Sequence, residues 1–342
     1  MVTVQDLVNE GDVLRPPFDR ELAEFLVTIG PNAPRLHAVD DIHVLRERLV
    51  GAHAITDEEL SCDGKFHVYD QLIPGPPASP DVSVLICRPV GVSEPTPAFF
   101  YVHGGGMVLG DNRLGLHEYA LTWAREFDAA VVSVEYRLAP ESPHPGPVED
   151  CYAGLLWTFE HAEDLGIDTS RIFITGASGG GGLAAATTLL ARDRGGLDLA
   201  GQILMCPMID DRNETISAHQ FDGVGIWDRS TNMVAWKALL GESCGDANVS
   251  PSAAPARATN LAGLPPTFID VGSAETFRDE SIAYAQQIWE AGGDAELHVW
   301  AGGFHGYDGM APETKISQNT AAARLGWLHR QMLSTTREIS VD

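Results

Sequence analysis

The residues around Ser178 have the types and spacing of a nucleophilic serine site. Ser178 is the centre of Gly176-Ala-Ser-Gly-Gly180, which follows the β-rich segment Arg171–Thr175 and precedes a helical stretch. A strand, a sharp turn and a helix form the context in which a G-x-S-x-G serine is exposed for attack on a carbonyl carbon. Small residues are needed at both ends of the turn because larger side chains would collide with neighbouring backbone. The run predicts acyl transfer through a serine nucleophile.

The same run of glycines admits a second interpretation. Thr175-Gly-Ala-Ser-Gly-Gly-Gly-Gly182 also fits the T-G-x-x-x-G-x-G loop of short-chain dehydrogenases, where glycines let a cofactor pyrophosphate approach a helix N-terminus. Those enzymes place the loop after their first strand and have a Tyr-x-x-x-Lys motif further on. Here about four β-rich segments precede the loop, and no tyrosine has a lysine four residues later. A nucleotide-cofactor site and a purely structural turn are therefore the weaker alternatives.

A second glycine cluster could stabilise the negative charge that acyl transfer creates. His103-Gly-Gly-Gly106 follows the β-rich segment Ala98–Val102, as an HGGG-type oxyanion loop does. Glycines let backbone amides approach to within about 3 Å of the tetrahedral oxyanion. We expect His103, which belongs to the loop itself, to make structural hydrogen bonds rather than to act as the base. The expected oxyanion donors are the amides of Gly105, Gly106 and Gly179.

A serine nucleophile needs a general base, and His305 is the best placed of the 12 histidines. In the fold that carries a G-x-S-x-G turn of this kind, the chain order is serine, acid, histidine, with the histidine in a loop after a late strand. His305 lies in such a loop, Ala301-Gly-Gly-Phe-His-Gly306, directly after the segment Ala295–Trp300. We expect His298, inside that segment, to pack or point to solvent, and His329, on the last helix, to lie at the surface.

The carboxylate that orients the base should follow the preceding strand, Thr267–Val271. The next loop contains Glu275, Asp279 and Glu280. Glu275 comes first out of the strand, whereas the other two lie where a helix begins and are explained by the preference for acidic residues in a first turn. Glu275 is therefore the predicted acid, with Asp279 as the alternative.

The elements that would position these residues alternate between strand and helix. Helical stretches are expected near 115–127, 147–165, 183–194, 278–291 and 314–333, and in the fourth Ile282, Ala285 and Trp289 recur at helical spacing. Such alternation predicts an α/β fold: a mostly parallel, eight-stranded sheet with helices on both faces, its first strands pairing antiparallel at an edge. The expected strands are Lys65–Tyr69, Val82–Arg88, Ala98–Val102, Ala130–Val134, Arg171–Thr175, Gly201–Cys206, Thr267–Val271 and Ala295–Trp300.

Two segments lie outside this alternation and are expected to form a helical cap. Residues 1–55 have the pattern of amphipathic helix, and residues 208–250 contain Met208, Phe221, Trp227, Met233 and Trp236. Aromatic-rich insertions after sheet strands often cover ligand sites, so a substrate lid is favoured over plain surface helices. The sheet domain would then consist of residues 56–207 and 251–342.

Composition limits the partners and cofactors. Of 342 residues, 44% are hydrophobic and 20% charged, as in a soluble globular protein. The chain has 48 acidic and 22 basic residues, and its formal charge of −26 argues against nucleic acid or an anionic membrane as a partner. We interpret the charge as a solubilising acidic surface, with adaptation to high salt as the alternative.

The termini and cysteines suggest a reduced, cytoplasmic protein. The N-terminus lacks a signal-peptide pattern, and no stretch approaches the roughly 18 apolar residues of a membrane span. The five cysteines are scattered, without C-x-x-C pairs, so we expect free, mostly buried thiols and neither disulfides nor a metal site. The sequence contains no internal repeat, which argues against a solenoid. A homodimer is the assembly that base rates favour.

Taken together, the motifs resemble the hormone-sensitive-lipase-like esterases over about residues 85–310. The resemblance rests on H-G-G-G at 103–106, Tyr136-Arg-Leu-Ala-Pro-Glu141, the turn at 176–180, F-R-D-E at 277–280 and His305-Gly306. It implies an α/β-hydrolase core, a cap formed from the N-terminus and an insertion after the sixth strand, and hydrolysis of carboxylic esters without cofactor or metal. Gly-Gly after the serine, with H-G-G-G-M, is similar to the brefeldin A esterase branch.

The chain departs from the family pattern at two places. Glu275-Thr276-Phe277 stands where the family usually has Asp-Pro-Leu, and Gly179 stands where it usually has Ala. The apolar cap segment leads us to expect short- to medium-chain esters as small-molecule substrates. A non-catalytic binding protein on the same fold is the alternative, because the plant gibberellin receptors resemble this family but lack a working triad; here the histidine is present.

Overall fold

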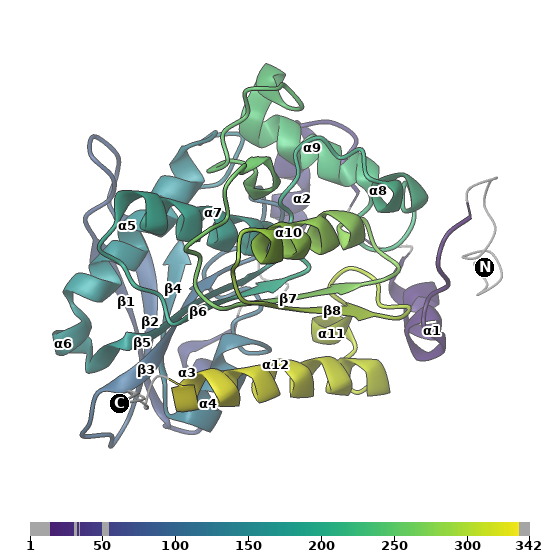
Figure 1. Cartoon of the computed structure of the whole chain (residues 1–342). Helices are drawn as coiled ribbons and strands as arrows, with labels where there is room; N and C mark the ends of the chain where they lie inside the picture. Colours follow the sequence, from purple (N-terminus) through teal and green to yellow (C-terminus); the bar gives the residue numbers. More distant parts are fainter. Residues whose placement is uncertain (1–13, 31–32, 34, 50–54, 335–342) are drawn as a thin grey trace.

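The chain forms one eight-stranded sheet around which the described helices pack (Figure 1). The computed structural model describes residues 14–30, 33, 35–49 and 55–334. The strands lie in the order β1-β2-β4-β3-β5-β6-β7-β8, in which β1 pairs with β2 and β2 with β4 in antiparallel fashion and every other pair is parallel. Their bounds are Phe66–Ile73, Val82–Pro89, Thr96–Val102, Ala130–Glu135, Ile167–Ala177, Gly201–Met205, Thr267–Gly272 and Ala295–Trp300 for β1 to β8. The predicted fold class and the antiparallel edge are confirmed.

Helices cover both faces of the sheet, as Figure 1 shows. Two apolar clusters follow from the alternation of side chains along each strand: Phe100 of β3 packs on the side of α5, α7 and α10, and its neighbour Phe99 on the side of α4 and α12. Both faces are buried, which explains why the central strands read as continuous apolar runs. The helices are α1 Arg20–Ile29, α2 Asp41–Leu49, α3 Asp57–Leu60, α4 Ala120–Phe127, α5 Gly146–Glu160, α6 Ala162–Leu165, α7 Gly179–Arg194, α8 Ile216–Gln220, α9 Arg229–Leu240, α10 Arg278–Glu290, α11 Tyr307–Met310 and α12 Lys315–Ser334.

Helix α10 buries a different face from the one expected. Its predicted apolar stripe included Ile282 and Trp289, but these side chains are 36% and 48% exposed. The face that packs on the sheet contains Tyr284, Ala285 and Ile288. The Trp289 side chain stays half-exposed, and its Nε1 donates to the carbonyl of Ala295 at the start of β8.

The described parts of the N-terminal segment contact the insertion that follows β6. Arg35 donates to the Gly225 carbonyl and forms an ion pair with Asp228, and the rings of Phe18 and Phe221 have centroids 6.0 Å apart. In Figure 1, α8 and α9 lie above α10, with α2 behind α9. The boundary predicted after residue 55 lies directly beyond residues 50–54, which the structure does not describe, and among the described residues before it helix is found at α1 and α2.

Candidate active site

The turn between β5 and α7 holds Ser178 in a strained conformation. Its φ of 59° and ψ of −124° lie outside the regions that side-chain-bearing residues ordinarily adopt. Backbone hydrogen bonds fix the turn: the Ser178 amide donates to the Met205 carbonyl, and its own carbonyl accepts from the amides of Gly182 and Met208. The hydroxyl therefore stands at the carboxyl end of the sheet, directly before the N-terminus of a helix.

The structure brings the predicted acid and base to this hydroxyl. His305 Nε2 lies 2.8 Å from Ser178 Oγ, and His305 Nδ1 lies 2.7 Å from Glu275 Oε2. The second Glu275 oxygen, Oε1, accepts from the Gly272 amide at 3.2 Å. All three residues are buried, with exposed fractions of 9%, 7% and 2% for Ser178, His305 and Glu275. This is the hydrogen-bond geometry of a serine nucleophile, a general base and the carboxylate that orients it.

The alternative acid, Asp279, has another set of partners. Asp279 Oδ2 accepts from the amide of Ser217 in α8, and Asp279 Oδ1 accepts from Arg278 Nε. Glu280 is also occupied, because its Oε1 accepts from the amides of Ile209 and Asp210. These two side chains hold the start of the insertion after β6 onto α10, whereas Glu275 faces the histidine.

The glycine loop at 103–106 lies against the N-terminus of α7. Gly105 and Gly106 have φ of 103° and 62°, and a Cβ at Gly179 would lie 2.8 Å from the backbone nitrogens of Gly106 and Met107. Among the described residues, the amides of Gly105 and Gly106 donate to no backbone carbonyl, which is the state that an oxyanion donor requires. The close approach also gives a physical reason for Gly179, since the alanine usual in the family would press on the loop.

His103 is buried beneath the loop. Its ring stacks on Tyr136, with centroids 4.1 Å apart, and its Nδ1 is 2.8 Å from the Gly104 carbonyl oxygen. Burial lowers the pKa of His103 to about 4, so the imidazole is neutral at pH 7. The Tyr136 hydroxyl donates to the His103 carbonyl, which ties the family's Tyr-Arg-Leu-Ala-Pro-Glu segment to the same loop.

Two aromatic side chains that the sequence did not connect with the triad surround it. The Phe277 ring meets His305 edge to face, with centroids 5.0 Å apart, and the ring of Trp227, from the insertion after β6, has its centroid 6.4 Å from that of the same imidazole. Trp227 was expected only to be part of a lid. Trp227 and His305 are almost 80 positions apart in the chain, so no local sequence pattern predicts their contact.

A buried ion-pair network behind the triad was also missed. Arg324 of α12 donates to both oxygens of Asp270 in β7, and to Asp308 of α11, three residues after the base. The three residues are separated by up to 54 positions. In the sequence, each of the three residues has the pattern of an ordinary surface charge. Only the fold shows that together they support the loop of His305.

Cys206 lies close enough to two triad residues to raise the question of a metal site. Ligand atoms of Cys206, Glu275 and His305 lie within 4.8 Å of one another, and this is the metal-like group found among the described residues. Hydrogen bonding within the triad already explains the approach of the other two residues. Burial, followed by the negative charge of Glu275, raises the pKa of the Cys206 thiol well above its ordinary value, which disfavours the thiolate that a metal needs. The five cysteines are free, as expected.

Comparison with known proteins places this geometry in a family. Residues 99–309 match the model of a family described as having the α/β-hydrolase fold. The chain is 34% identical over 303 residues to the esterase LipI of Mycobacterium tuberculosis, covering 85% of this chain and 90% of the relative. It is 33% identical over 330 residues to the carboxylesterase NlhH of the same species, covering 95% and 99%.

Solved structures agree with the sequence relatives. A bacterial heroin esterase superposes with a TM-score of 0.82 at 38% identity, covering 92% of this chain and 98% of that one. The esterase LipW of Mycobacterium marinum has the same TM-score at 31% identity, covering 94% and 99%. Among the described helices, none combines the length and the apolar character needed to span a membrane. The chain belongs to the hormone-sensitive-lipase-like esterases of the α/β-hydrolase fold, and it is a serine carboxylesterase.

Proposed function

We propose that Ser178, His305 and Glu275 hydrolyse short- to medium-chain carboxylic esters through an acyl-enzyme. The observation that supports the assignment most directly is the continuous pair of hydrogen bonds, 2.8 Å from serine to histidine and 2.7 Å from histidine to glutamate. His305 Nε2 takes the hydroxyl proton as Ser178 Oγ attacks the ester carbonyl carbon. Glu275 accepts from Nδ1–H, which keeps the imidazole in the required tautomer and stabilises the imidazolium.

The remaining steps use the same groups. The amides of Gly105, Gly106 and Gly179 stabilise the oxyanion of the tetrahedral intermediate. The imidazolium of His305 then donates its proton to the leaving alcohol as the carbon–oxygen bond to that alcohol breaks. Water, deprotonated by His305, attacks the acyl-enzyme, and the proton returns to Ser178 Oγ as the acid leaves. The reaction needs no cofactor.

Small ester molecules are the substrates, and the cap supports a preference for the shorter ones. Trp227 and Phe277 flank the base, and Ser178 is only 9% exposed. An apolar, confined space favours small acyl and alcohol groups over long lipid chains. We propose one cap from the N-terminal segment and residues 208–250. A homodimer and a cytoplasmic location stay proposals that sedimentation and cell fractionation test.

The decisive experiment labels the nucleophile. A fluorophosphonate should form a mass adduct on the Ser178 peptide of the wild-type chain and none on Ser178→Ala, and p-nitrophenyl acetate should be hydrolysed by the first only. Folded wild-type protein without an adduct or turnover would favour the non-catalytic binding alternative. A p-nitrophenyl ester series with its maximum at long chains would contradict the proposed substrate range.

A further inference from the structure

The indole of Trp227 lies on the oxyanion loop. A Cβ built at Gly106 would come within 2.5 Å of Trp227 Cζ2 and Cη2, so the six-membered ring of the indole occupies the space directly beside this glycine. The Trp227 and His305 rings are 6.4 Å apart between centroids. The side chain is 6% exposed. It therefore forms a wall of the space in which the ester carbonyl must bind.

Two buried asparagines hold the indole at its other edge. Trp227 Nε1 donates to Asn232 Oδ1 at 3.1 Å, and Asn232 Nδ2 donates to Asn213 Oδ1 at 3.1 Å. Asn213 Nδ2 in turn donates to the Arg229 carbonyl at 2.9 Å. Both asparagines are fully buried, so each amide that lost a partner would stay unsatisfied. The hydrogen bonds thus fix the orientation of the indole.

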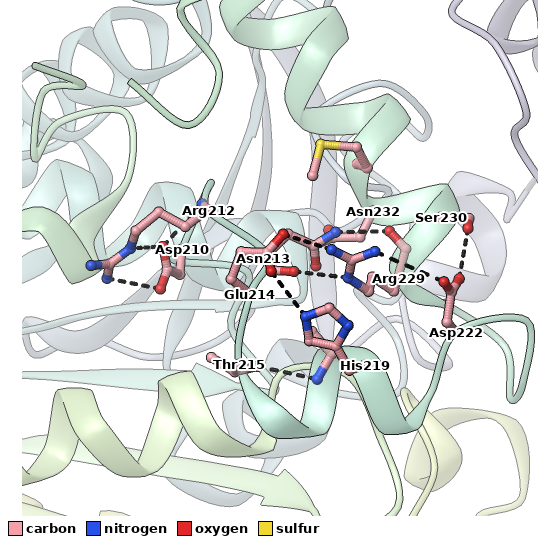
Figure 2. Close-up of polar contacts among 12 residues, drawn as sticks. Asp210, Arg212, Asn213, Glu214, Thr215, His219, Asp222, Arg229, Ser230 and Asn232 are labelled. Atoms are coloured by element: carbon pink, nitrogen blue, oxygen red, sulfur yellow. Dashed lines mark hydrogen bonds and ion pairs between the residues drawn. The ribbon is translucent and has the colours of Figure 1, made fainter. Parts of the chain in front are cut away.

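Backbone and charge restrain the asparagines themselves. Asn213 has a φ of 55°, a left-handed conformation that asparagine tolerates better than most residues, and its carbonyl accepts from Arg229 Nε at 3.0 Å. Arg229 also pairs with Glu214 and lies near Asp222. Figure 2 shows Arg229 between these carboxylates, next to Asn213 and Asn232, which are hydrogen-bonded to each other.

The backbone of Trp227 is tied to the loop of the catalytic acid. Thr276 Oγ1 donates to the Trp227 carbonyl at 2.9 Å in a buried hydrogen bond. Thr276 directly follows Glu275 and stands where the family usually has proline, which offers no side-chain donor. The cap residue is therefore fixed relative to the triad from both its side chain and its main chain.

The two sides of the ester can be assigned from the mechanism. The leaving alcohol must lie toward His305, because that imidazole protonates it. The oxyanion faces the loop amides, so the acyl chain takes the remaining direction from the carbonyl carbon, and we place it against the Trp227 ring that lies beside Gly106. We propose that Trp227 limits the length of the acyl chain and that Asn232 and Asn213 are positioning residues that keep its indole in place. This inference rests on the proposed esterase function.

The test compares acyl chains at constant alcohol. Specificity, kcat/KM, is measured for p-nitrophenyl acetate, butyrate, hexanoate and octanoate with the wild-type chain, Trp227→Ala and Trp227→Phe. One methylene in an apolar pocket changes specificity by roughly 10-fold or more. Trp227→Ala should therefore raise the ratio of octanoate to acetate specificity by at least about 10-fold, and Trp227→Phe by less. Trp289→Ala, which removes a half-exposed tryptophan of α10, is the matched control and should leave the ratio unchanged.

A double-mutant cycle tests the asparagines. Asn232→Leu should shift the ratio in the same direction as Trp227→Ala, mainly through a lower KM for the longer esters. In the Trp227→Phe background, where no indole N–H needs a partner, the same substitution should add little to the shift, since coupling of this kind appears as non-additivity. Equal shifts in both backgrounds would show that Asn232 acts independently of the indole N–H, and would overturn its positioning role.

Three outcomes distinguish a failure of the acyl-length inference from a failure of the proposed esterase function. An unchanged acyl profile in active, folded Trp227→Ala overturns the acyl limit. A shift confined to a series of acetate esters with different alcohols shows that Trp227 faces the leaving group, and also overturns it. A wild-type chain that hydrolyses no ester and takes up no fluorophosphonate contradicts the proposed function itself, and the inference with it.

Discussion

At the scale of single residues, the length of the acidic side chain decides how the triad is assembled. Glu275 has one methylene more than the aspartate usual in the family, yet its Oε2 still lies 2.7 Å from His305 Nδ1. With this longer side chain, one carboxylate oxygen contacts the base while the other accepts from the backbone amide of Gly272, at the end of the strand that precedes the loop. The acid is thus held by the backbone as well as by the base.

Glu275→Gln should lower kcat by about 10³- to 10⁴-fold with little change in KM. An amide can donate to Nδ1, which would hold the imidazole in the tautomer that cannot accept the serine proton, and a comparable substitution in serine proteases costs about 10⁴. Steady-state kinetics on p-nitrophenyl acetate measures the effect. Asp279→Asn is the matched control and should retain most activity, because Asp279 holds Ser217 rather than the base. The reverse pattern would assign the acid role to Asp279.

At the scale of elements, the local sequence pattern predicted where the strands lie, but it did not predict the side-chain contacts between distant elements. Each predicted strand overlaps an observed one, because buried parallel strands need apolar residues on both faces. Helix α4 begins at Ala120 rather than near 115, after a segment in which Gly115 has a φ of 73°. Ser178, Glu275 and His305 followed from their order along the chain. The contacts of Trp227, Asn213 and Arg324 could not, because the fold brings them together from distant elements.

Arg324 holds α12 onto β7 and α11, and its removal should be costly. Arg324→Met leaves the Asp270 and Asp308 carboxylates without their shared cation, in a site where Arg324 is 4% and Asp270 2% exposed. Breaking a buried pair in this way costs roughly 3–5 kcal/mol. Urea unfolding followed by fluorescence measures the loss of unfolding free energy. Arg330→Met removes a half-exposed partner of Glu296 and should cost less than about 1 kcal/mol; similar losses for both variants would contradict a special role for Arg324.

Glu135 at the end of β4 should make stability depend on pH. Burial raises the pKa of Glu135 to about 7, while the Asn112 amide donates to its Oε2 at 2.6 Å. A carboxyl with a raised pKa in the folded state favours folding when protonated, so its contribution is present below about pH 4.5 and is lost as pH rises through about 7.

In Glu135→Gln, the new side chain keeps an acceptor for the backbone N–H of Asn112 but cannot ionise. It should raise the free energy of unfolding at pH 8, relative to wild type, by on the order of 2 kcal/mol and flatten the profile between pH 5 and 7. Urea unfolding across this range measures both changes. Glu94→Gln replaces an exposed carboxylate and should leave the profile unaltered. A wild-type profile that is flat in the same window would show that Glu135 ionises normally.

At the scale of the whole molecule, the insertion after β6, residues 208–250, depends on contacts with the N-terminal segment and with the loop of Glu275. The loop after β7 contacts this insertion through Thr276 and Asp279, and the N-terminal segment contacts it through Arg35. The residues joined are separated by up to 190 positions. The position of Trp227 beside the triad therefore depends on contacts that lie outside the triad, and loss of one of them should loosen the space around Ser178.

Arg35→Ala tests that dependence. The guanidinium donates to the Gly225 carbonyl at 2.8 Å and pairs at 2.9 Å with Asp228, which directly follows Trp227 and caps α9. Its loss should raise KM for short esters several-fold and increase proteolytic cleavage within residues 208–250, while fluorophosphonate still labels Ser178. Arg20→Ala, which removes a 93% exposed side chain from α1, should change neither quantity. If Arg35→Ala also leaves KM and cleavage unchanged, the N-terminal segment is not needed to hold the cap, and the contacts from Thr276 and Asp279 suffice.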